Sequence, residues 1–323
     1  MRALITGITG QDGSYLAEFL LREGYEVHGI SRQVDGLKEL RKQPGWSGNE
    51  KRLTVHCADY AIGSDFAEIV RHVAPTEVYH LAAHSFVGQV GGEATILDAN
   101  VIATHRILQA THEHAPRCRF FLAGSSEMFG DAKEVPQTED TAFQPVNIYG
   151  LSKVAAYHLM CYYRESHGLH ACCGILFNHE SPRRGAQFVS RKITSTVASI
   201  KLGLTNELRL GNLDTRKDWG DARDYVQGMR LILGAPEPRD YILATGILHS
   251  VQDIVELAFR YVGLNWKDHV VSVPELRRKA TTNPLVGNAS RAKKELGWSA
   301  QRNFESLLEE MIATDVHKAS KAE

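Results

Sequence analysis

Short apolar runs alternate with helix-like segments through the first half of the chain. The helix-like segments, with apolar residues three and four positions apart, are residues 14–23, 65–73, 99–113 and 152–166. Before, between and after them lie apolar runs of strand length at 3–6, 25–30, 53–56, 77–81, 119–123 and 170–177. Parallel strands buried on both faces show such runs. The alternation predicts right-handed βαβ units and an α/β fold with a Rossmann-type, doubly wound parallel sheet.

The pattern becomes irregular after residue 177. Helices are expected at 191–202, 222–233, 251–262 and 304–314, and residues 279–289, with Pro284 and Gly287, are typical of a loop plus a short strand. A polar tail starts at about His317. We therefore expect two parts. Residues 1–177, with about 215–235, form the dinucleotide-binding domain, and about 178–214 and 236–323 form a smaller, mainly C-terminal α/β substrate-binding lobe.

Composition narrows the class of partner. The 323 residues carry a net charge of −1, which gives no reason to expect nucleic acid or a membrane surface. No apolar run reaches membrane-spanning length, and the first strand begins too early for a signal peptide. Five scattered cysteines predict reduced thiols in the cytoplasm, with adjacent Cys172 and Cys173 as packing residues. The 15 histidines are dispersed, and no Cys/His group has metal-ligand spacing, so no metal is expected.

A glycine-rich turn joins the first strand to the first helix. Glycines at 7, 10 and 13 follow the apolar run, and a helical pattern begins at once. Such a turn lets the backbone approach a pyrophosphate, which the helix N-terminus then attracts. The predicted dinucleotide contacts here are Gly7, Ile8, Thr9, Gly10, Gln11, Asp12 and Gly13.

The end of the second strand indicates which nicotinamide cofactor binds. An NAD site usually places an acid there for the ribose 2′-hydroxyl, but Ser31, Arg32 and Gln33 follow this strand. Arg32 would pair with a 2′-phosphate, which favours NADP over NAD; the alternative is that Arg32 is a solvated loop residue. Asp59, after the third strand, is a candidate for the adenine amino group or an ordinary turn carboxylate.

A candidate catalytic set lies at the ends of later elements. Tyr149 and Lys153 are four residues apart at the head of a helix, so they share one face, and the ammonium is expected to lower the pKa of the phenol. Ser125 and Glu127 follow the fifth strand. Ser125 can share a substrate hydroxyl proton, or serve as a turn hydroxyl. Glu127 can remove a proton next to a newly formed ketone, or favour a helix start by its charge.

These features together resemble the extended short-chain dehydrogenase/reductase family, and within it the GDP-mannose 4,6-dehydratases. The Gln11-Asp12 pair first points to this branch. Besides Tyr149 and Lys153, the matching pieces are residues 7–13, 81–85, 125–130, 175–185, 200–203, 210–214 and 218–220. The resemblance implies that Ser125, Glu127, Tyr149 and Lys153 are catalytic.

The resemblance also implies binding residues. Beyond the glycine turn, Tyr149 and Lys153, the cofactor contacts would be Arg32, Asp59, Tyr60, Leu81, Ala82, Ala83, Ser85, His179 and Arg184. The substrate contacts would be Ser85, Asn178, Lys192, Gly211, Arg216, Lys217 and Arg278, with Asn178 and Lys192 near the diphosphate.

The chain departs from the family pattern mainly in the substrate lobe. Val146 stands where the family has Arg, Lys217 stands where it has Arg before Asp-Trp, and residues 278–283 lack the usual Glu. Arg and Lys differ toward a diphosphate, because only Arg offers a planar fork. The sugar and the base therefore stay open, with a GDP-linked sugar favoured. Of the oligomers expected, a homodimer is favoured over the family's homotetramer.

The activity implied is that of a hydro-lyase, a nucleotide-sugar 4,6-dehydratase. It would convert GDP-mannose or a related GDP-sugar to the 4-keto-6-deoxy product through an internal NADP redox cycle. Two alternatives stay open: an NADPH-dependent reductase or epimerase of a related nucleotide sugar, and a non-catalytic NADP-sensing protein of the same fold. Glu127 argues against the first, and the intact Ser/Tyr/Lys set argues against the second.

Overall fold

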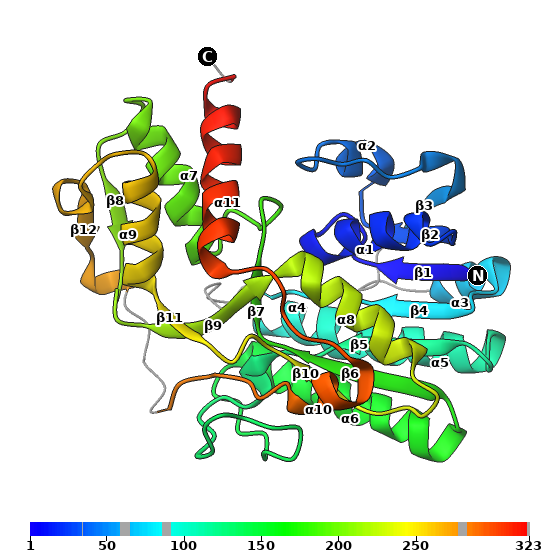
Figure 1. Ribbon diagram of the computed structural model, residues 1–323. Helices are drawn as coiled ribbons and strands as arrows, with labels where there is room; N and C mark the ends of the chain where they lie inside the picture. Colours follow the sequence, from blue (N-terminus) through cyan, green and yellow to red (C-terminus); the bar gives the residue numbers. More distant parts are fainter. Residues whose placement is uncertain (34, 59–64, 86–91, 277–282, 322–323) are drawn as a thin grey trace.

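A parallel sheet of seven strands organises the larger part of the molecule (Figure 1). The computed structural model describes residues 1–323 except 34, 59–64, 86–91, 277–282 and 322–323. The strand order is β10-β6-β5-β4-β1-β2-β3, and every neighbouring pair runs parallel. The strands are β1 (Arg2–Thr6), β2 (Glu26–Ser31), β3 (Leu53–Cys57), β4 (Glu77–His80), β5 (Arg119–Ala123), β6 (His170–Leu176) and β10 (Tyr241–Leu243). The predicted parallel sheet and its six strands are confirmed.

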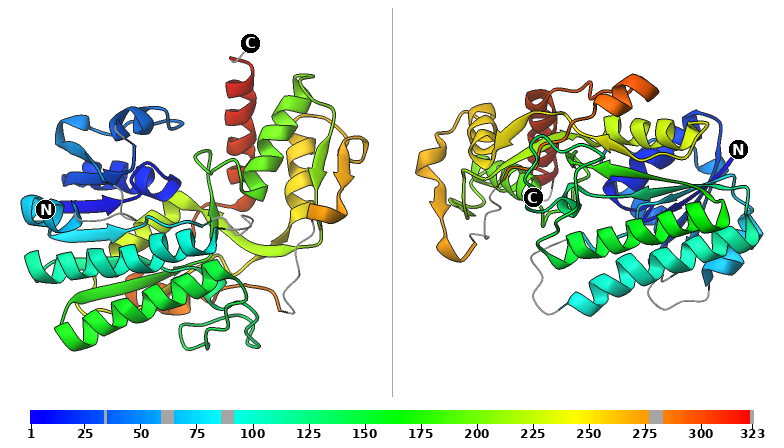
Figure 2. Two further views of the ribbon diagram at one scale, coloured as in Figure 1. Left: turned by 180° about the vertical axis from the view of Figure 1, so that it is seen from behind. Right: turned by 90° about the horizontal axis from the view of Figure 1, so that it is seen from below.

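Helices cover both faces of this sheet, as Figure 2 shows. On one face α1 (Gln11–Arg22) packs beside α8 (Ala222–Gly234), and on the other α5 (Ala103–His114) packs between α3 (Asp65–Val73) and α6 (Ile148–His167). Successive strand residues enter opposite cores, because side chains alternate along a strand. In β1, Leu4 joins the core under α3, α5 and α6, whereas Ala3 and Ile5 join the core under α1 and α8.

A smaller unit lies at the carboxyl ends of the parallel strands (Figure 1). Its strands are β7 (Asn178–Glu180), β9 (Arg216–Asp221) and β11 (Leu248–Ser250), in the order β11-β9-β7, with a separate pair β8 (Leu208–Leu210) and β12 (Val270–Ser272). Three helices, α7 (Val189–Lys201), α9 (Val251–Tyr261) and α11 (Phe304–Ala319), pack against one another. A third core, which includes Trp219, Phe259 and Met311, holds this unit together.

Several details differ from the sequence-based expectations. The seventh strand, β10, and the helix α10 (Ser290–Leu296) that packs on it were not predicted, and neither was α2 (Gly36–Arg41). Residues 283–289 contain no strand, only an isolated bridge from Gly287 to Gln137. The tail expected from His317 continues α11 to Ala319. The three-residue β10 is too short to show a strand pattern, and α2 and α10 span two turns or less, which is too short to show a helical period.

Candidate functional site

The glycine turn is shaped to receive an anionic group. A Cβ on Gly13 would lie 2.3 Å from the carbonyl oxygen of Gly7, so the turn requires glycine there. Gly10 is the N-cap of α1 and supplies no side-chain hydrogen bond to the first-turn N–H groups. Those groups remain available to a ligand, and the helix dipole adds a partial positive charge. This donor set fits the pyrophosphate of a dinucleotide.

Gln11 and Asp12 tie the same turn to β7, which is 168 residues away. Gln11 Nε2 donates to the backbone oxygen of His179 over 3.1 Å, and Gln11 Oε1 accepts from Ser181 Oγ over 2.7 Å. Asp12 Oδ2 lies 2.9 Å from His179 Nε2. The Gln-Asp pair therefore fixes the smaller unit to the dinucleotide turn.

His179 is held as an imidazolium. Its Nδ1 lies 2.7 Å from the carbonyl oxygen of Phe177, which can only accept, and its Nε2 faces the Asp12 carboxylate. Burial acts to lower the pKa of His179, but the attraction and hydrogen bond of Asp12 outweigh it and the pKa is raised. Burial likewise acts to raise the pKa of Asp12, yet His179 holds it below its ordinary value. The imidazolium offsets the negative charge of Asp12 in the turn.

Arg183 makes a second connection between the two parts. Its guanidinium pairs with Glu18 of α1 over 2.8 Å, with both side chains almost fully buried. Arg183 Nε also donates to the carbonyl oxygen of Pro44, and the guanidinium lies 3.9 Å from the centre of the Tyr15 ring. Because a buried charge is costly unless it is paired and hydrogen-bonded, these partners fix Arg183 in place.

The end of β4 is fixed by Thr6 and His80. Thr6 Oγ1 accepts from the backbone N–H groups of Leu81 and Ala82, so it donates to His80 Nδ1 over 2.8 Å. His80 Nε2 lies 3.0 Å from Thr104 Oγ1. Burial lowers the pKa of His80 to about 3, and the imidazole is neutral. This network sets the segment that begins at Leu81 beside the glycine turn.

Tyr149, Lys153 and Ser125 meet at the carboxyl ends of β5 and β6, and each is nearly buried. Tyr149 lies in the first turn of α6, and a hydrogen bond joins it to Ser125. Lys153 Nζ, one turn later, donates to the carbonyl oxygen of Ala123 over 2.8 Å and lies 5.9 Å from the centre of the Tyr149 ring. The structure thus places Tyr149, Lys153 and Ser125 together, as the sequence predicted.

The expected lowering of the Tyr149 pKa is wrong for this structure. Burial raises the pKa of Tyr149 to about 12, and the hydrogen bond with Ser125 lowers it by less. Burial also lowers the pKa of Lys153 to about 8, despite the opposing influence of Cys173 and Asp12. Desolvation, which disfavours the charged form, is the largest influence on the pKa of both groups.

Glu127 lies in a short 3-10 helix, η3 (Ser126–Met128), against the start of α6. A Cβ on Gly150 would lie 2.4 Å from the carbonyl oxygen of Glu127, so glycine allows this close approach. One carboxylate oxygen accepts from Asn147 Nδ2 over 2.8 Å, and the other accepts from Lys217 Nζ over 3.0 Å. The backbone N–H of Glu127 donates to Ser125 Oγ over 3.2 Å. Glu127 therefore stands beside the Ser/Tyr/Lys group with its carboxylate held at both oxygens.

The other predicted contacts are more dispersed. Arg32 follows β2, and its Nη1 lies 3.5 Å from His84 Nε2. Arg184 pairs with Glu180 over 3.1 Å, and Lys192 Nζ donates to the carbonyl oxygen of Arg209 over 2.7 Å.

The remaining predicted contacts fall into two groups. Asn178, Gly211 and Arg216 lie on or next to β7, β8 and β9, respectively, and Ser85 lies five residues after the end of β4. Asp59, Tyr60 and Arg278 lie outside the described residues.

Sequence reasoning missed two polar residues that support the site. Asn147 caps α6, accepting from the N–H of Gly150, while it holds Glu127. Asn100 sits in a π-helical turn (Asp98–Ile102) and donates to Ser152 Oγ over 2.9 Å, and Ser152 in turn donates to the carbonyl oxygen of Tyr149. The polar residue before a helix start was a usable signal for Asn147; a π-helical turn has no comparable signal.

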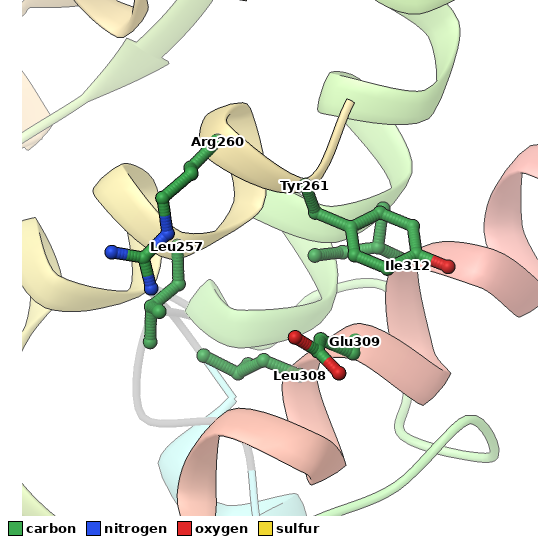
Figure 3. Close-up of a pocket in the computed structure, with 6 residues that line it drawn as sticks. All are labelled: Leu257, Arg260, Tyr261, Leu308, Glu309 and Ile312. Carbon is green, nitrogen blue, oxygen red and sulfur yellow. The ribbon is translucent and has the colours of Figure 1, made fainter. Parts of the chain in front are cut away.

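The described residues show little sign of another kind of site. A pocket of about 240 Å³ lies between α9 and α11, and Figure 3 shows that none of its lining side chains belongs to the catalytic group. No group of three or more His, Cys, Asp or Glu residues suited to a metal ion occurs in the described part of the chain. No helix there is long and apolar enough to cross a membrane. All five cysteines are unpaired, and Cys172 and Cys173 are buried, as predicted.

Comparison with known proteins decides the family. The model of the GDP-mannose 4,6 dehydratase family matches residues 4–311. The chain belongs to this family. It is 44% identical to GDP-mannose 4,6 dehydratase 1 of Arabidopsis thaliana, over 99% of this chain and 91% of the relative. It is 41% identical to the human GDP-mannose 4,6 dehydratase, over 97% of this chain and 91% of the relative.

Solved structures confirm the fold of this family member. A dTDP-glucose 4,6-dehydratase of Streptomyces venezuelae superposes with a TM-score of 0.85 at 21% identity, covering 99% of this chain and 98% of the other. RMD from Pseudomonas aeruginosa, in complex with NADPH, superposes with a TM-score of 0.81 at 21% identity, covering 98% of this chain and 99% of the other. At such identities the likeness shows the shared fold alone. A nicotinamide cofactor is typical of the family.

Proposed function

We propose that this chain removes water from GDP-mannose and yields the GDP-linked 4-keto-6-deoxy sugar, as a GDP-mannose 4,6-dehydratase. The observation that carries the proposal is the carboxylate of Glu127 beside Ser125 and Tyr149, in a chain of this family. Hydride exchange at C4 needs only the Ser/Tyr/Lys group. Loss of water across C5 and C6 also needs a base for the C5 proton.

The first step belongs to Tyr149, with Ser125 and Lys153. The phenolate of Tyr149 accepts the proton of the C4 hydroxyl, and Ser125 shares that hydrogen bond. A nicotinamide cofactor held by the glycine turn, His179 and Arg184 would supply a reversible acceptor for the C4 hydride, which C6 receives in the product. Because burial raises the pKa of Tyr149 to about 12, the phenolate needs added positive charge, which Lys153 and the oxidised ring supply.

The second step belongs to Glu127. The C4 ketone acidifies the C5 proton, and the Glu127 carboxylate accepts it. The C5–H electrons form the C5–C6 double bond, the C6–O bond breaks, and the hydroxyl leaves as water with the proton that Glu127 carries. After the hydride is returned to C6, C5 is reprotonated with the proton that Tyr149 took from the C4 hydroxyl, which restores the Tyr149 phenolate. Ser125 or Glu127 assists departure of the hydroxyl, because both lie beside Tyr149.

NADP is the cofactor we propose. Arg32 places a guanidinium directly after β2, where a 2′-phosphate is bound in this kind of fold, and no acid occupies that position. The glycine turn, the segment 81–85, His179 and Arg184 would hold the rest of the molecule. Because the cofactor ends each cycle as it began, its loss in mid-cycle would strand an intermediate, so tight retention is expected.

The substrate would lie between the two parts of the fold. Asn178 and Lys192 would face the diphosphate, with Ser85, Gly211, Arg216 and Arg278 as further contacts. We further propose a homodimer or homotetramer, of which the dimer is favoured, and a cytoplasmic location, which the unpaired cysteines support.

A panel of nucleotide sugars tests the function. The purified protein is incubated with each sugar without added NADPH, and the products are weighed by mass spectrometry. We expect GDP-mannose to lose one water. Glu127→Gln should abolish this loss, whereas Glu207→Gln, on the smaller unit and paired with exposed Arg209, should not. Net consumption of NADPH, or a stereoisomer of unchanged mass, would favour a reductase or an epimerase instead.

A further inference from the structure

The Glu127 carboxylate is held at both oxygens by donors from two distant elements. Asn147, at the start of α6, donates to Oε2, and Lys217, on β9, donates to Oε1. Glu127 and Lys217 are each about one-quarter exposed, so their ion pair is only partly screened by water. Two separate donors fix both the position and the plane of the carboxylate.

Both donors are themselves fixed by secondary structure. Asn147 Oδ1 accepts from the N–H of Gly150 over 2.8 Å, which leaves its NH2 group for Glu127. Lys217 pairs with His249 in the register of β9 and β11, so its backbone cannot shift freely. Among the described residues, Lys217 of β9 and Tyr149 of α6 are titratable groups close to Glu127, and Ser125 is a polar neighbour on its own turn.

We propose that Lys217 is a positioning residue for Glu127, which it orients and keeps ionised for abstraction of the C5 proton, and that it is not a ligand of the substrate diphosphate. This inference rests on the proposed dehydratase activity. A cation beside a carboxylate favours the ionised form. When Glu127 has accepted the C5 proton, the same cation favours its release to the departing hydroxyl, so Lys217 assists both halves of the elimination.

The choice of Lys in place of Arg follows from Asn147. An Arg fork binds both oxygens of a carboxylate, whereas an ammonium is a compact charge that needs only one. In this chain Asn147 already occupies Oε2, and Lys217 approaches Oε1 alone.

The pH profile of water loss separates the two roles of Lys217. For Lys217→Met we expect the acid limb of kcat to move up by about one pH unit, because the lost cation had lowered the pKa of the base. KM should change little. Lys217→Arg keeps the positive charge, so its acid limb of kcat should lie at the pH of the intact protein. If Lys217→Met instead raises KM about tenfold or more and leaves the limb in place, Lys217 binds substrate and the proposal is wrong.

A titration without substrate keeps this test independent of the proposed function. The protein is labelled with ¹³C at the Glu side-chain carboxyl, and the Glu127 signal is assigned by its absence in Glu127→Gln. We expect Lys217→Met to raise the midpoint of this signal by about one pH unit relative to the intact protein. An unchanged midpoint in a variant with a native circular dichroism spectrum would overturn the inference, even where water loss by the unaltered protein is established.

Lys192→Met serves as a matched control. It removes an ammonium of α7 that donates to the carbonyl oxygen of Arg209 and that is a proposed diphosphate contact. We expect it to raise KM and to leave both the acid limb and the Glu127 midpoint unchanged. If Lys192→Met shifts the Glu127 midpoint as much as Lys217→Met does, the shift reflects the net charge of the protein. That result would contradict a specific pairing of Lys217 with Glu127.

Discussion

Nε2 of His179 lies 2.9 Å from Oδ2 of Asp12, so the acid in the dinucleotide turn carries an imidazolium partner. An unpaired carboxylate would repel a pyrophosphate at the N-terminus of α1. The pair removes that repulsion and also joins β7 to the turn. Its two residues come from segments that the sequence alone did not connect.

Removing the imidazolium should destabilise the protein. We expect His179→Gln to lower the free energy of unfolding at pH 6 by about 2–3 kcal/mol, because the variant removes the cation that pairs with Asp12. This loss is small for a broken buried ion pair, because the Asp12 side chain is partly exposed. Urea unfolding checks this. In an Asp12→Asn background the same substitution should cost clearly less, and equal costs in both backgrounds would contradict the pairing.

The same pair predicts a pH window for stability. The raised pKa of His179 means that its contribution is fully present below the ordinary value of 6.5 and is lost as the pH rises through the raised value. The lowered pKa of Asp12 means that its contribution is present above 3.8 and is lost as the pH falls further. The difference in unfolding free energy between the intact protein and His179→Gln should therefore be largest between these values and decline at alkaline pH. A difference that stays constant to pH 9 would contradict this.

The pKa of His80 is lowered, whereas that of His179 is raised, so His80 should stay neutral. Its pKa of about 3 and its fixed partners predict a neutral imidazole with the proton on Nε2 throughout the range in which the protein is folded. Nitrogen-15 NMR of the histidine rings measures this directly. A His80 signal that titrates near pH 6 to 7 would show that the Thr6–His80–Thr104 network is misassigned.

Arg32 should set the preference between NADP and NAD. We expect Arg32→Ala to weaken NADP binding about tenfold or more, since a charge-assisted contact is removed, and to leave NAD binding nearly unchanged. Fluorescence titration of cofactor-free protein gives both dissociation constants. Arg41→Ala, whose guanidinium instead pairs with Glu50, is the matched control and should change neither constant.

Tyr149→Phe should retain the fold and lose the chemistry. Removal of the phenol takes away the base of the first step, which is worth about 10²–10⁴-fold in rate. The ring remains packed, so the unfolding midpoint should change little. A variant that keeps more than a tenth of the turnover number, measured by product formation, would exclude Tyr149 as the base.

Much of the large sheet and of the catalytic group followed from local sequence. Strands such as β1 and β6 are buried on both faces and therefore appear as apolar runs, and Tyr149 and Lys153 are neighbours on one helix. The three-residue β10 gave no such pattern, although it completes the sheet. Local sequence thus indicates candidate catalytic residues when they lie on the same helix or strand.

Contacts between distant elements were not predictable in the same way. Lys217 and Glu127 are 90 residues apart, and the sequence suggested a diphosphate as the partner of Lys217. The pKa of Tyr149 also depends on burial, which the Tyr-to-Lys spacing does not report. Pairing and desolvation are tertiary properties, so the structure was needed for both.

In the proposed cycle, NADP serves as a temporary store of hydride within one turnover. GDP-mannose carrying deuterium at C4 tests this most directly, with the purified protein and no added NADPH. We predict that the deuterium appears at C6 of the same sugar in the 4-keto-6-deoxy product, with no net change in absorbance at 340 nm. Loss of the label to solvent, or a product that keeps its C6 hydroxyl, would contradict this role of NADP.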